Sequence, residues 1–412
     1  MPAGTYTLTI AGAGEDAAAT GDLDLTSNIT LTGAGAGSTS INGSWMDRIL
    51  HVTGAYTVNI SGVTLTHGNG SGGGIRNDGG VLTITDSAIS DNNSGANAGG
   101  ILNTGTLAIN NSTIFDNNAW TDAGGISSAG TLTITNSTFS YNNAGSKGGG
   151  IFNSGKITVT ASTFSNNNSG TDGGAIFSSS TLAISTSTFS ANNAANGGGI
   201  YAGGVSTITH STFSANSASS GGGIFTQSSV TIANSTFSNN DASHGDDSYT
   251  NGGSLVIINS TLFGAVSDPD RIAGSGGGVY NVAGGGGSVT LFNTIVAGHA
   301  SGGNCVGVIT NGGYNLDDDA TCGWGSVNGS MSNADPALGA LTGSPAYFPL
   351  NLNSPAIDAG DNAACAAAPV NNTAQNGVTR PIDGDSNGTA TCDIGAFEAA
   401  AGFRLYLPAI MK

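Results

Sequence analysis

Residues 126–150 read ISSAGTLTITNSTFSYNNAGSKGGG, and residues 151–175 read IFNSGKITVTASTFSNNNSGTDGGA. The two segments share one pattern, and the same unit recurs before and after them. Each unit opens at an isoleucine that follows a glycine-rich triplet, with 24–26 residues between successive isoleucines. A fixed period in this range indicates a repeat architecture. The isoleucines are Ile75, Ile101, Ile126, Ile151, Ile176, Ile200 and Ile224.

The pattern inside one unit predicts short β-strands. Residues 131–135, TLTIT, alternate polar and apolar side chains, which is the period of a half-buried strand. Gly, Asn and Ser separate such runs, and no apolar pattern of helical period is present. Several short strands in each unit fit one coil of a parallel β-helix, which rises by about 4.8 Å. We therefore predict an all-β, single-stranded parallel β-helix in which Leu132 and Ile134 stack on their equivalents in neighbouring coils.

Further columns keep the same period and predict ladders along the helix. An apolar column should form a second inward ladder, and its aromatic members are Phe139, Phe164, Phe189, Phe213 and Phe237. Three residues later an asparagine recurs, where stacked amides can bond from coil to coil and Asn tolerates a left-handed backbone. These asparagines are Asn92, Asn117, Asn142, Asn167, Asn192, Asn216 and Asn240. A serine column is interpreted as corner residues: Ser137, Ser162, Ser187, Ser211 and Ser235.

The chain of 412 residues divides into five stretches by regularity. Residues 1–66 are predicted to form an N-terminal cap with irregular first coils, and residues 67–264 the regular repeats. Residues 265–345 are predicted to form late, irregular coils. Residues 346–398, which contain several prolines, are predicted to cap the C-terminal end. Residues 399–412 form an apolar tail.

Charge and hydropathy restrict the partners. The formal net charge is −18, and only 8% of residues are charged. Nucleic acid and anionic membrane surfaces attract basic patches, so neither is an expected partner. No apolar run is long enough to span a bilayer. The composition suggests an extracellular protein, and because the chain opens almost directly into a strand-like run, we expect that an export leader is missing from this sequence.

Four cysteines lie in the last third of the chain: Cys305, Cys322, Cys365 and Cys392. No CxxC pair is present, which argues against zinc. An even number of cysteines in an extracellular chain indicates disulfides. The simplest pairing joins the first two and the last two, although three pairings are possible.

One motif suggests a metal. Residues 383–388 read DGDSNG, which matches the first half of a calcium-binding loop with alternating oxygen ligands. We predict a possible calcium site at Asp383, Asp385 and Asn387, with Asp393 as a further ligand. The alternative is a turn rich in Asp and Asn that binds no metal, and no cofactor is required for the fold. A second acidic group, Glu15, Asp16, Asp22 and Asp24, is interpreted as a solvated loop with calcium as the alternative.

The sequence gives only weak evidence for a group of catalytic residues. A glycosidase needs two carboxylates about 5–9 Å apart. Asp91 and Asp116 share a column on adjacent coils, but the column continues with uncharged residues, so exposed turn residues are the simpler interpretation. A lyase would need a base, for which Arg271 is the best candidate against a plain surface ion pair. One column alternates in sign through Asp122, Lys147 and Asp172 and is interpreted as a surface charge ladder.

The repeats also resemble a known family. Residues 173–176, GGAI, and 139–142, FSYN, are similar to the GGAI and FxxN repeats of polymorphic outer membrane proteins. Residues 354–361, SPAIDAGD, and 392–398, CDIGAFE, resemble the C-terminal region of choice-of-anchor Q surface proteins. Together the resemblances extend over roughly residues 5–398. They imply a secreted, right-handed β-helix on a bacterial surface, usually without an assigned activity.

These observations favour a non-enzymatic, secreted or cell-surface protein with a structural or adhesin-like role. We expect its flank of stacked Asn, Ser and Thr to contact surface glycans. Self-assembly into extracellular fibres is a specific version, in which the tail adds a strand to a neighbouring copy. The tail residues concerned are Leu405, Tyr406, Leu407 and Ile410. The alternatives are a polysaccharide lyase or glycoside hydrolase and, less favoured, an ice-binding protein that uses the outward threonines of the TLTIT strands.

Overall fold

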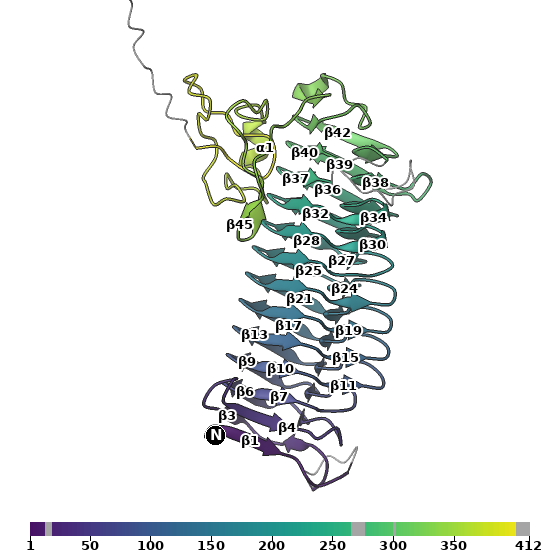
Figure 1. The fold of residues 1–412 in the computed structure, drawn as a ribbon, viewed down its shortest axis with the longest axis vertical. Coiled ribbons are helices and arrows are strands. Elements are labelled where there is room, and N and C mark those ends of the chain that lie inside the picture. The colour runs from purple at the N-terminus through teal and green to yellow at the C-terminus, as the bar shows by residue number, and fades with distance from the viewer. Residues whose placement is uncertain (13–18, 265–276, 300–301, 401–412) are drawn as a thin grey trace, which may run out of the picture.

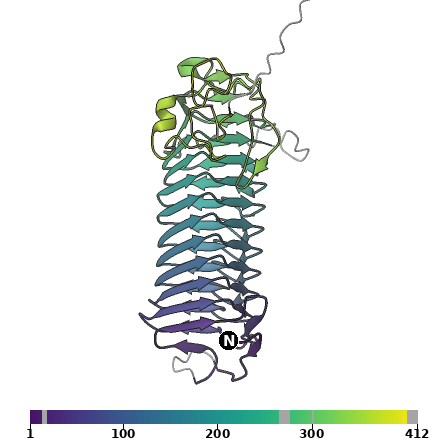
Figure 2. The same ribbon diagram turned by 90° about the vertical axis from the view of Figure 1, so that its left-hand side faces the viewer.

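A computed structural model describes residues 1–12, 19–264, 277–299 and 302–400. These residues form a parallel β-helix of about 11 turns, drawn as a tall stack of coils in Figures 1 and 2. The N-terminus lies at one end of the stack, and the chain climbs coil by coil toward the other end. The predicted all-β solenoid is therefore confirmed.

Three long parallel sheets run along the β-helix, and most coils contribute one strand to each. Sheet 1 contains β1 (Gly4–Thr7), β4 (Thr39–Asn42), β7 (Thr64–Thr66), β10 (Ala88–Ser90), β14 (Thr113–Phe115), β18 (Thr138–Ser140), β22 (Thr163–Ser165), β26 (Thr188–Ser190), β29 (Thr212–Ser214), β33 (Thr236–Ser238), β37 (Thr261–Phe263), β40 (Ile295–Ala297), β43 (Leu316–Asp317) and β44 (Met331–Ser332). Sheet 2 contains β2 (Leu23–Leu25), β5 (Leu50–Val52), β8 (Ile75–Asn77), β12 (Ile101–Asn103), β16 (Ile126–Ser128), β20 (Ile151–Asn153), β24 (Ile176–Ser178), β27 (Ile200–Ala202), β31 (Ile224–Thr226), β35 (Ser248–Thr250), β38 (Val279–Asn281) and β41 (Cys305–Val306).

Sheet 3 is built from the TLTIT-type strands. It contains β3 (Ile29–Thr32), β6 (Thr57–Ser61), β9 (Val81–Thr85), β13 (Thr106–Asn110), β17 (Thr131–Thr135), β21 (Lys156–Thr160), β25 (Leu182–Ser185), β28 (Ser206–Thr209), β32 (Ser229–Ala233), β36 (Ser254–Ile258), β39 (Ser288–Phe292) and β42 (Ile309–Gly313). The shorter elements are β11 (Asn93–Ser94), β15 (Asn118–Ala119), β19 (Asn143–Ala144), β23 (Asn168–Ser169), β30 (Ser217–Ser220), β34 (Asp241–His244), β45 (Thr342–Gly343), β46 (Ala346–Tyr347), the 3-10 helix η1 (Val327–Gly329) and the α-helix α1 (Asn362–Ala366).

The register agrees with the predicted stacking. Leu132 pairs with Leu107 in the coil before it and with Ile157 in the coil after it, and Ile134 follows the same rule. These side chains are fully buried. The rings of Phe139 and its successors stack with centroids 4.8–5.0 Å apart. Each buried apolar side chain contributes about 1.5–3 kcal/mol, so the core gains stability with every added coil.

The corners of the coils use left-handed backbone. Asp116 and Tyr141, which follow sheet 1 strands, have φ of 53° and 55°. The sequence placed the left-handed backbone at the asparagines, but it lies at the residue before each of them, since Asn117 and Asn142 come directly after these corners. The left-handed residue makes the bend, and the asparagine that follows turns its side chain inward.

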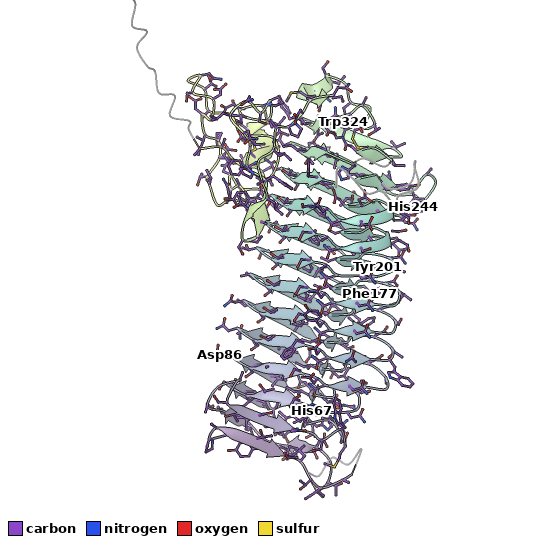
Figure 3. The ribbon with its side chains drawn as sticks, viewed as in Figure 1. His67, Asp86, Phe177, Tyr201, His244 and Trp324 are labelled. Carbon is purple, nitrogen blue, oxygen red and sulfur yellow. A yellow bond between two sulfur atoms is a disulfide. The ribbon has the colours of Figure 1, made fainter. Side chains whose placement is uncertain are left out.

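The lateral segment, residues 342–399, is packed differently from the prediction. It lies along the flank of the late coils rather than across their end (Figure 1). Thr212 donates a hydrogen bond to the carbonyl of Ala346, and Thr261 accepts one from the backbone N–H of Ala396. Trp324 instead closes the C-terminal end, where it is 5% exposed within the main core and is labelled in Figure 3.

Candidate functional site

The asparagine ladder is an internal feature of the β-helix. Each side-chain amide from Asn92 to Asn216 donates to the side-chain oxygen of the next asparagine at 2.9–3.0 Å. Each amide also donates to a backbone carbonyl, for example Asn142 to Ile114 at 2.9 Å. The predicted coil-to-coil bonding is confirmed. However, these side chains are at most 1% exposed, so the prediction that they contact glycans is wrong.

The serine column is internal for the same reason. The hydroxyl of Ser162 donates to the carbonyl of Thr160 at 2.8 Å and accepts the backbone N–H of Ser137 at 3.1 Å. Its equivalents Ser187, Ser211 and Ser235 make the same contacts. The serines are thus corner residues, as predicted. Outward threonines of the expected glycan-binding flank, such as Thr133, are exposed.

An aromatic column on the outer face of sheet 2 was not predicted. We call it the aromatic ridge, and it consists of Phe152, Phe177, Tyr201, Phe225, Tyr249 and Tyr280. Successive rings are stacked with centroids 5.0–5.2 Å apart. Because each ring covers the face of the next, the ridge presents ring edges to its surroundings. The sequence signal is present, since four ridge residues directly follow the column isoleucines, but Ser127 and Leu102 interrupt the series below.

Polar side chains flank the aromatic ridge. The Lys147 ammonium lies 4.7 Å from the centroid of Phe177, and the Tyr201 hydroxyl donates to Gln227. Figure 3 labels Phe177, Tyr201 and His244 along one edge of the β-helix. Burial, and secondly the charge of Asp172, raises the pKa of Tyr201, so its hydroxyl remains a donor. The ridge thus combines four partly exposed aromatic residues, Phe152, Tyr201, Tyr249 and Tyr280, with charged groups of both signs, whereas Phe177 and Phe225 are buried.

The predicted charge ladder is only partly formed. The Lys147 ammonium lies 3.6 Å from Asp172, whereas Asp122 accepts the backbone N–H of Lys147 rather than its ammonium. Asp91 and Asp116 occupy left-handed corners, and Asp116 is exposed. Burial, and secondly the charge of Asp91, raises the pKa of Asp116. The two aspartates are therefore corner residues.

Both predicted disulfides are present. Cys305 and Cys322 are joined with their Cα atoms 4.8 Å apart, and Cys365 and Cys392 with theirs 6.7 Å apart. The first bond links β41 to the segment that carries Trp324. The second lies in the lateral segment, against the coil residue Asn259.

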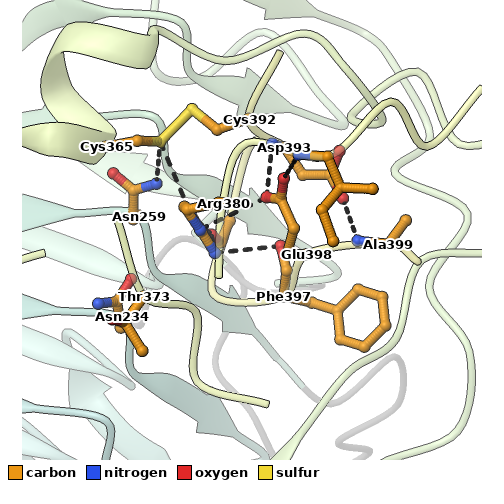
Figure 4. A network of polar contacts seen from close by, with 12 residues as sticks. Asn234, Asn259, Cys365, Thr373, Arg380, Cys392, Asp393, Phe397, Glu398 and Ala399 are labelled. Carbon is orange, nitrogen blue, oxygen red and sulfur yellow. Dashed lines mark hydrogen bonds and ion pairs between the residues drawn. A yellow bond between two sulfur atoms is a disulfide. The ribbon is translucent and has the colours of Figure 1, made fainter. Parts of the chain in front are cut away.

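A buried arginine organises the lateral segment (Figure 4). The Arg380 guanidinium donates to the carbonyls of Gly395 and Ala396 and lies 3.4 Å from the Glu398 carboxylate. Glu398 also accepts the backbone N–H groups of Ile382 and Asp393. Arg380 is 1% exposed and Glu398 fully buried, which makes this network a structural one.

The predicted calcium ligands do not all come together. Asp383 and Asp385 lie near one another, but their third neighbour is Asp358, with the three carboxylates within 4.8 Å. Asp393 lies behind this group, and its carboxylate accepts the backbone N–H groups of Asp358 and Ala399. The side-chain oxygen of Asn387 accepts a backbone N–H within its own turn. Asp358, Asp383 and Asp385 offer hard oxygen donors that could hold a divalent cation such as calcium, and Asn387, whose amide donates to Asp385 at 2.9 Å, stays a predicted ligand beside them.

A second polar chain continues the asparagine ladder at the C-terminal end. Asn240 donates to Asp247, which bonds His299 at 2.9 Å, and His299 contacts Asn304 at 3.1 Å. Asn304 donates to Asp317. Burial works against a charged imidazole, but Asp247 outweighs it and raises the pKa of His299. Burial also raises the pKa of Asp317 to about 7.

Two members of the N-terminal acidic group, Asp22 and Asp24, are buried rather than solvated. Asp22 is 3% exposed and forms an ion pair with Arg48, and Asp24 is 8% exposed. His51 lies 3.2 Å from Asp24 and 3.0 Å from Asp78. Burial, opposed by Arg48, raises the pKa of Asp22. Arg48 thus offsets the charge of Asp22 inside the first coils.

The N-terminal end carries an apolar pocket of about 360 Å³. It opens beneath the first strands of all three sheets, where the stack of inward side chains begins. Its lining residues are Met1, Tyr6, Thr7, Leu8, Leu23, Leu25, Ile29, Leu31, Ile41 and Leu50. We call it the N-terminal pocket.

Three predicted groups lie outside the described residues: Glu15 and Asp16, Arg271, and the tail residues. Within the described ranges, no helix is long and apolar enough to cross a membrane. Comparison of the sequence with protein-family models and with curated proteins finds no match.

Proposed function

We propose that the protein is a non-catalytic, extracellular rod with a structural and adhesin-like role. The observation that carries this proposal is the asparagine ladder. Its side-chain amides link successive coils from Asn92 to Asn240 by hydrogen bonds that lie inside the β-helix. Buried amides in a low-dielectric interior strengthen one another and hold a single register, as a rigid spacer requires.

Extracellular location is supported by the two disulfides, because such bonds persist in oxidising compartments. The strongly acidic composition is compatible with it. The resemblance of the repeats and the C-terminal region to secreted bacterial surface proteins implies the same location.

We assign the adhesive surface to the aromatic ridge. A polymer lying along the axis would meet a partly exposed aromatic residue at four of the six coils of the ridge, whose rings repeat at 5.0–5.2 Å. Ring edges supply apolar contact, while Lys147, Asp172 and Gln227 supply donors and acceptors. An extended polysaccharide, with alternating apolar and hydroxyl-bearing surfaces, matches this combination. Aromatic side chains with a polar end are typical of such interfaces.

Co-sedimentation with insoluble polysaccharides tests the proposal, with release of reducing ends measured in the same samples. We expect binding without turnover. The double substitution Tyr249→Ser and Tyr280→Ser should weaken binding, whereas Trp120→Ser and Tyr141→Ser remove exposed aromatics elsewhere and should leave it unchanged. Turnover would favour the polysaccharide-active enzyme, and equal binding by both double variants would exclude the ridge.

A further inference from the structure

A row of outward side chains lies on the short strand β15 and on the residues that flank it. Residues 116–120 read DNNAW, and exposed and buried positions alternate through them. Asp116, Asn118 and Trp120 are exposed, whereas Asn117 and Ala119 are buried. Alternate residues of a strand point to one face, so Asn118 and Trp120 project side by side, about 7 Å apart. The strands β11, β15 and β19 lie above one another along one edge of the β-helix (Figure 1).

Trp120 has no side chain stacked on it within its own column. The indole is 77% exposed, and the register of β15 places Gly95 in the coil before it and Gly145 in the coil after it. A Cβ atom at Gly145 would lie 2.1 Å from the Trp120 carbonyl oxygen, so this position excludes a side chain. In the aromatic ridge, by contrast, each ring covers the next. The uncovered indole therefore offers an apolar surface on which a sugar ring can pack.

Side-chain amides beside Trp120 offer a donor and an acceptor. Asn193 donates to Asn168 at 2.8 Å, and Asn168 donates to Asn143 at 2.7 Å, which forms a second, exposed asparagine ladder. Within the part of the chain that the structure describes, this ladder ends at Asn143. Asn118 lies directly below Asn143 in the register, and its amide donates to a backbone carbonyl at 3.4 Å, which leaves its side-chain oxygen as an acceptor. A donor and an acceptor on adjacent coils suit two neighbouring hydroxyl groups of a sugar.

Two carboxylates give the same edge a negative charge. Asp91 and Asp116 occupy equivalent corners of adjacent coils, since the register pairs Ser90 with Phe115. Asp116 is exposed and Asp91 half-exposed. Burial, and secondly the charge of Asp91, raises the pKa of Asp116, which indicates that the two carboxylates repel one another. A cation placed between them would relieve this repulsion.

We propose that this edge binds a short oligosaccharide of protonated amino sugars. One sugar ring packs on Trp120, and two of its hydroxyl groups bond to Asn118 and Asn143. An ammonium group further along the oligosaccharide lies between Asp91 and Asp116. The ligand crosses the axis of the rod, whereas a polysaccharide on the aromatic ridge lies along it. A neutral polysaccharide on the ridge does not need this edge, so the two sites are independent.

Calorimetric titration of the full chain with a tetramer of β-1,4-linked glucosamine tests the proposal, at a pH where the amines are protonated and the carboxylates ionised. We expect saturable binding. The N-acetylated tetramer keeps the rings without the charge, and tetralysine keeps the charge without the rings, so both should bind at least roughly tenfold more weakly. Equal binding of the acetylated tetramer would overturn recognition of the ammonium group, and equal binding of tetralysine would overturn recognition of the sugar.

Substitutions locate the site. Trp120→Ala and Asp116→Asn should each weaken glucosamine binding roughly tenfold. Asp86→Asn is the matched control, because Asp86 is also an exposed corner aspartate but lies at the opposite edge of the rod, where Figure 3 labels it. The double substitution Tyr249→Ser and Tyr280→Ser should leave glucosamine binding unchanged, which separates this site from the ridge.

Circular dichroism verifies that all the variants are folded. Unchanged affinity in Trp120→Ala would overturn the site. Equal losses in Asp116→Asn and Asp86→Asn would overturn it as well, because the oligomer would then bind only to the overall negative charge of the protein.

Discussion

The two ends of the β-helix differ in how the apolar core is covered. At the C-terminal end, Trp324 closes the core, and the Cys305–Cys322 disulfide ties its segment to the last coils. At the N-terminal end, a pocket of about 360 Å³ lies beneath strands whose outer edges are unpaired among the described residues. Both ends derive from one repeating coil, so the difference lies in what covers each end.

This comparison shows what the closing of an end requires. A repeat array is stabilised by contacts between neighbouring coils and needs a polar covering at its ends. The C-terminal end receives that covering from residues of its own chain that follow the last coils. The N-terminal end retains apolar surface among the described residues.

The largest effect should come from opening the closed end. Trp324→Ala removes the side chain that covers the last coils and should destabilise this end by about 3–5 kcal/mol. Trp120→Ala is the matched control, because Trp120 is 77% exposed, and it should change stability by less than about 0.5 kcal/mol. Thermal unfolding measures both. Similar losses in the two variants would mean that Trp324 does not close the end.

Mild acid should stabilise the lateral segment relative to the coils. Burial, and secondly Glu398, raises the pKa of Asp393 from 3.8 to about 7. The folded form thus holds a proton that the unfolded form has released above pH 4. The free energy of unfolding is therefore greatest below pH 4 and falls toward pH 7, by at most about 4 kcal/mol.

Hydrogen exchange of residues 342–399 between pH 4 and pH 8, corrected for the intrinsic rate, measures this effect. Asp393→Asn keeps a neutral side chain at every pH and should flatten the dependence. An unchanged slope in this variant would assign the pH dependence to other groups.

Breaking the asparagine ladder should lower the stability of the middle coils and leave the stability of both ends unchanged. Asn167→Ala removes an amide that links Asn142 to Asn192 and should cost about 1–3 kcal/mol. Asn166→Ala is the control, because Ala191 and Ala215 already occupy the equivalent left-handed corner. Chemical denaturation distinguishes the two. Equal destabilisation would show that the ladder adds no specific stability.

The smallest effect should come from calcium at the lateral segment. A cation bound by Asp358, Asp383 and Asp385 would stabilise the folded form by roughly 1.4 kcal/mol at tenfold excess over its Kd. Calorimetric titration measures binding, and chelation should reverse the stabilisation. Asp383→Asn should abolish it, while Asp116→Asn, in an exposed corner, should not. Heat release that is identical in both variants would contradict the site.

The sequence predicted the coil architecture because its determinants are local and repeated. Alternation in residues 131–135 defines the strand, and the fixed interval brings Leu132 above Leu107. Proximity in sequence also sufficed for the disulfide pairing. Periodicity alone does not say whether a polar column points inward, and this is why the asparagine and serine ladders were expected at the surface.

Contacts between segments distant in sequence were beyond such reasoning. The lateral segment docks through threonines such as Thr212 and Thr261, which look like every other threonine of the repeat. Asp358 joins the predicted acidic turn because its carboxylate accepts the backbone N–H of Asp385 and Asp393 holds its backbone. The aromatic ridge could have been predicted from the aromatic residues that follow four of the column isoleucines, but these residues extend over only some of the coils.

Hydrogen exchange at the two ends tests the central comparison most directly. We predict that the amides of β1, β2 and β3, whose outer edges are unpaired among the described residues, exchange faster than those of β43 and β44, near which Trp324 and the Cys305–Cys322 disulfide close the core. Equal exchange at the two ends would contradict the difference between them.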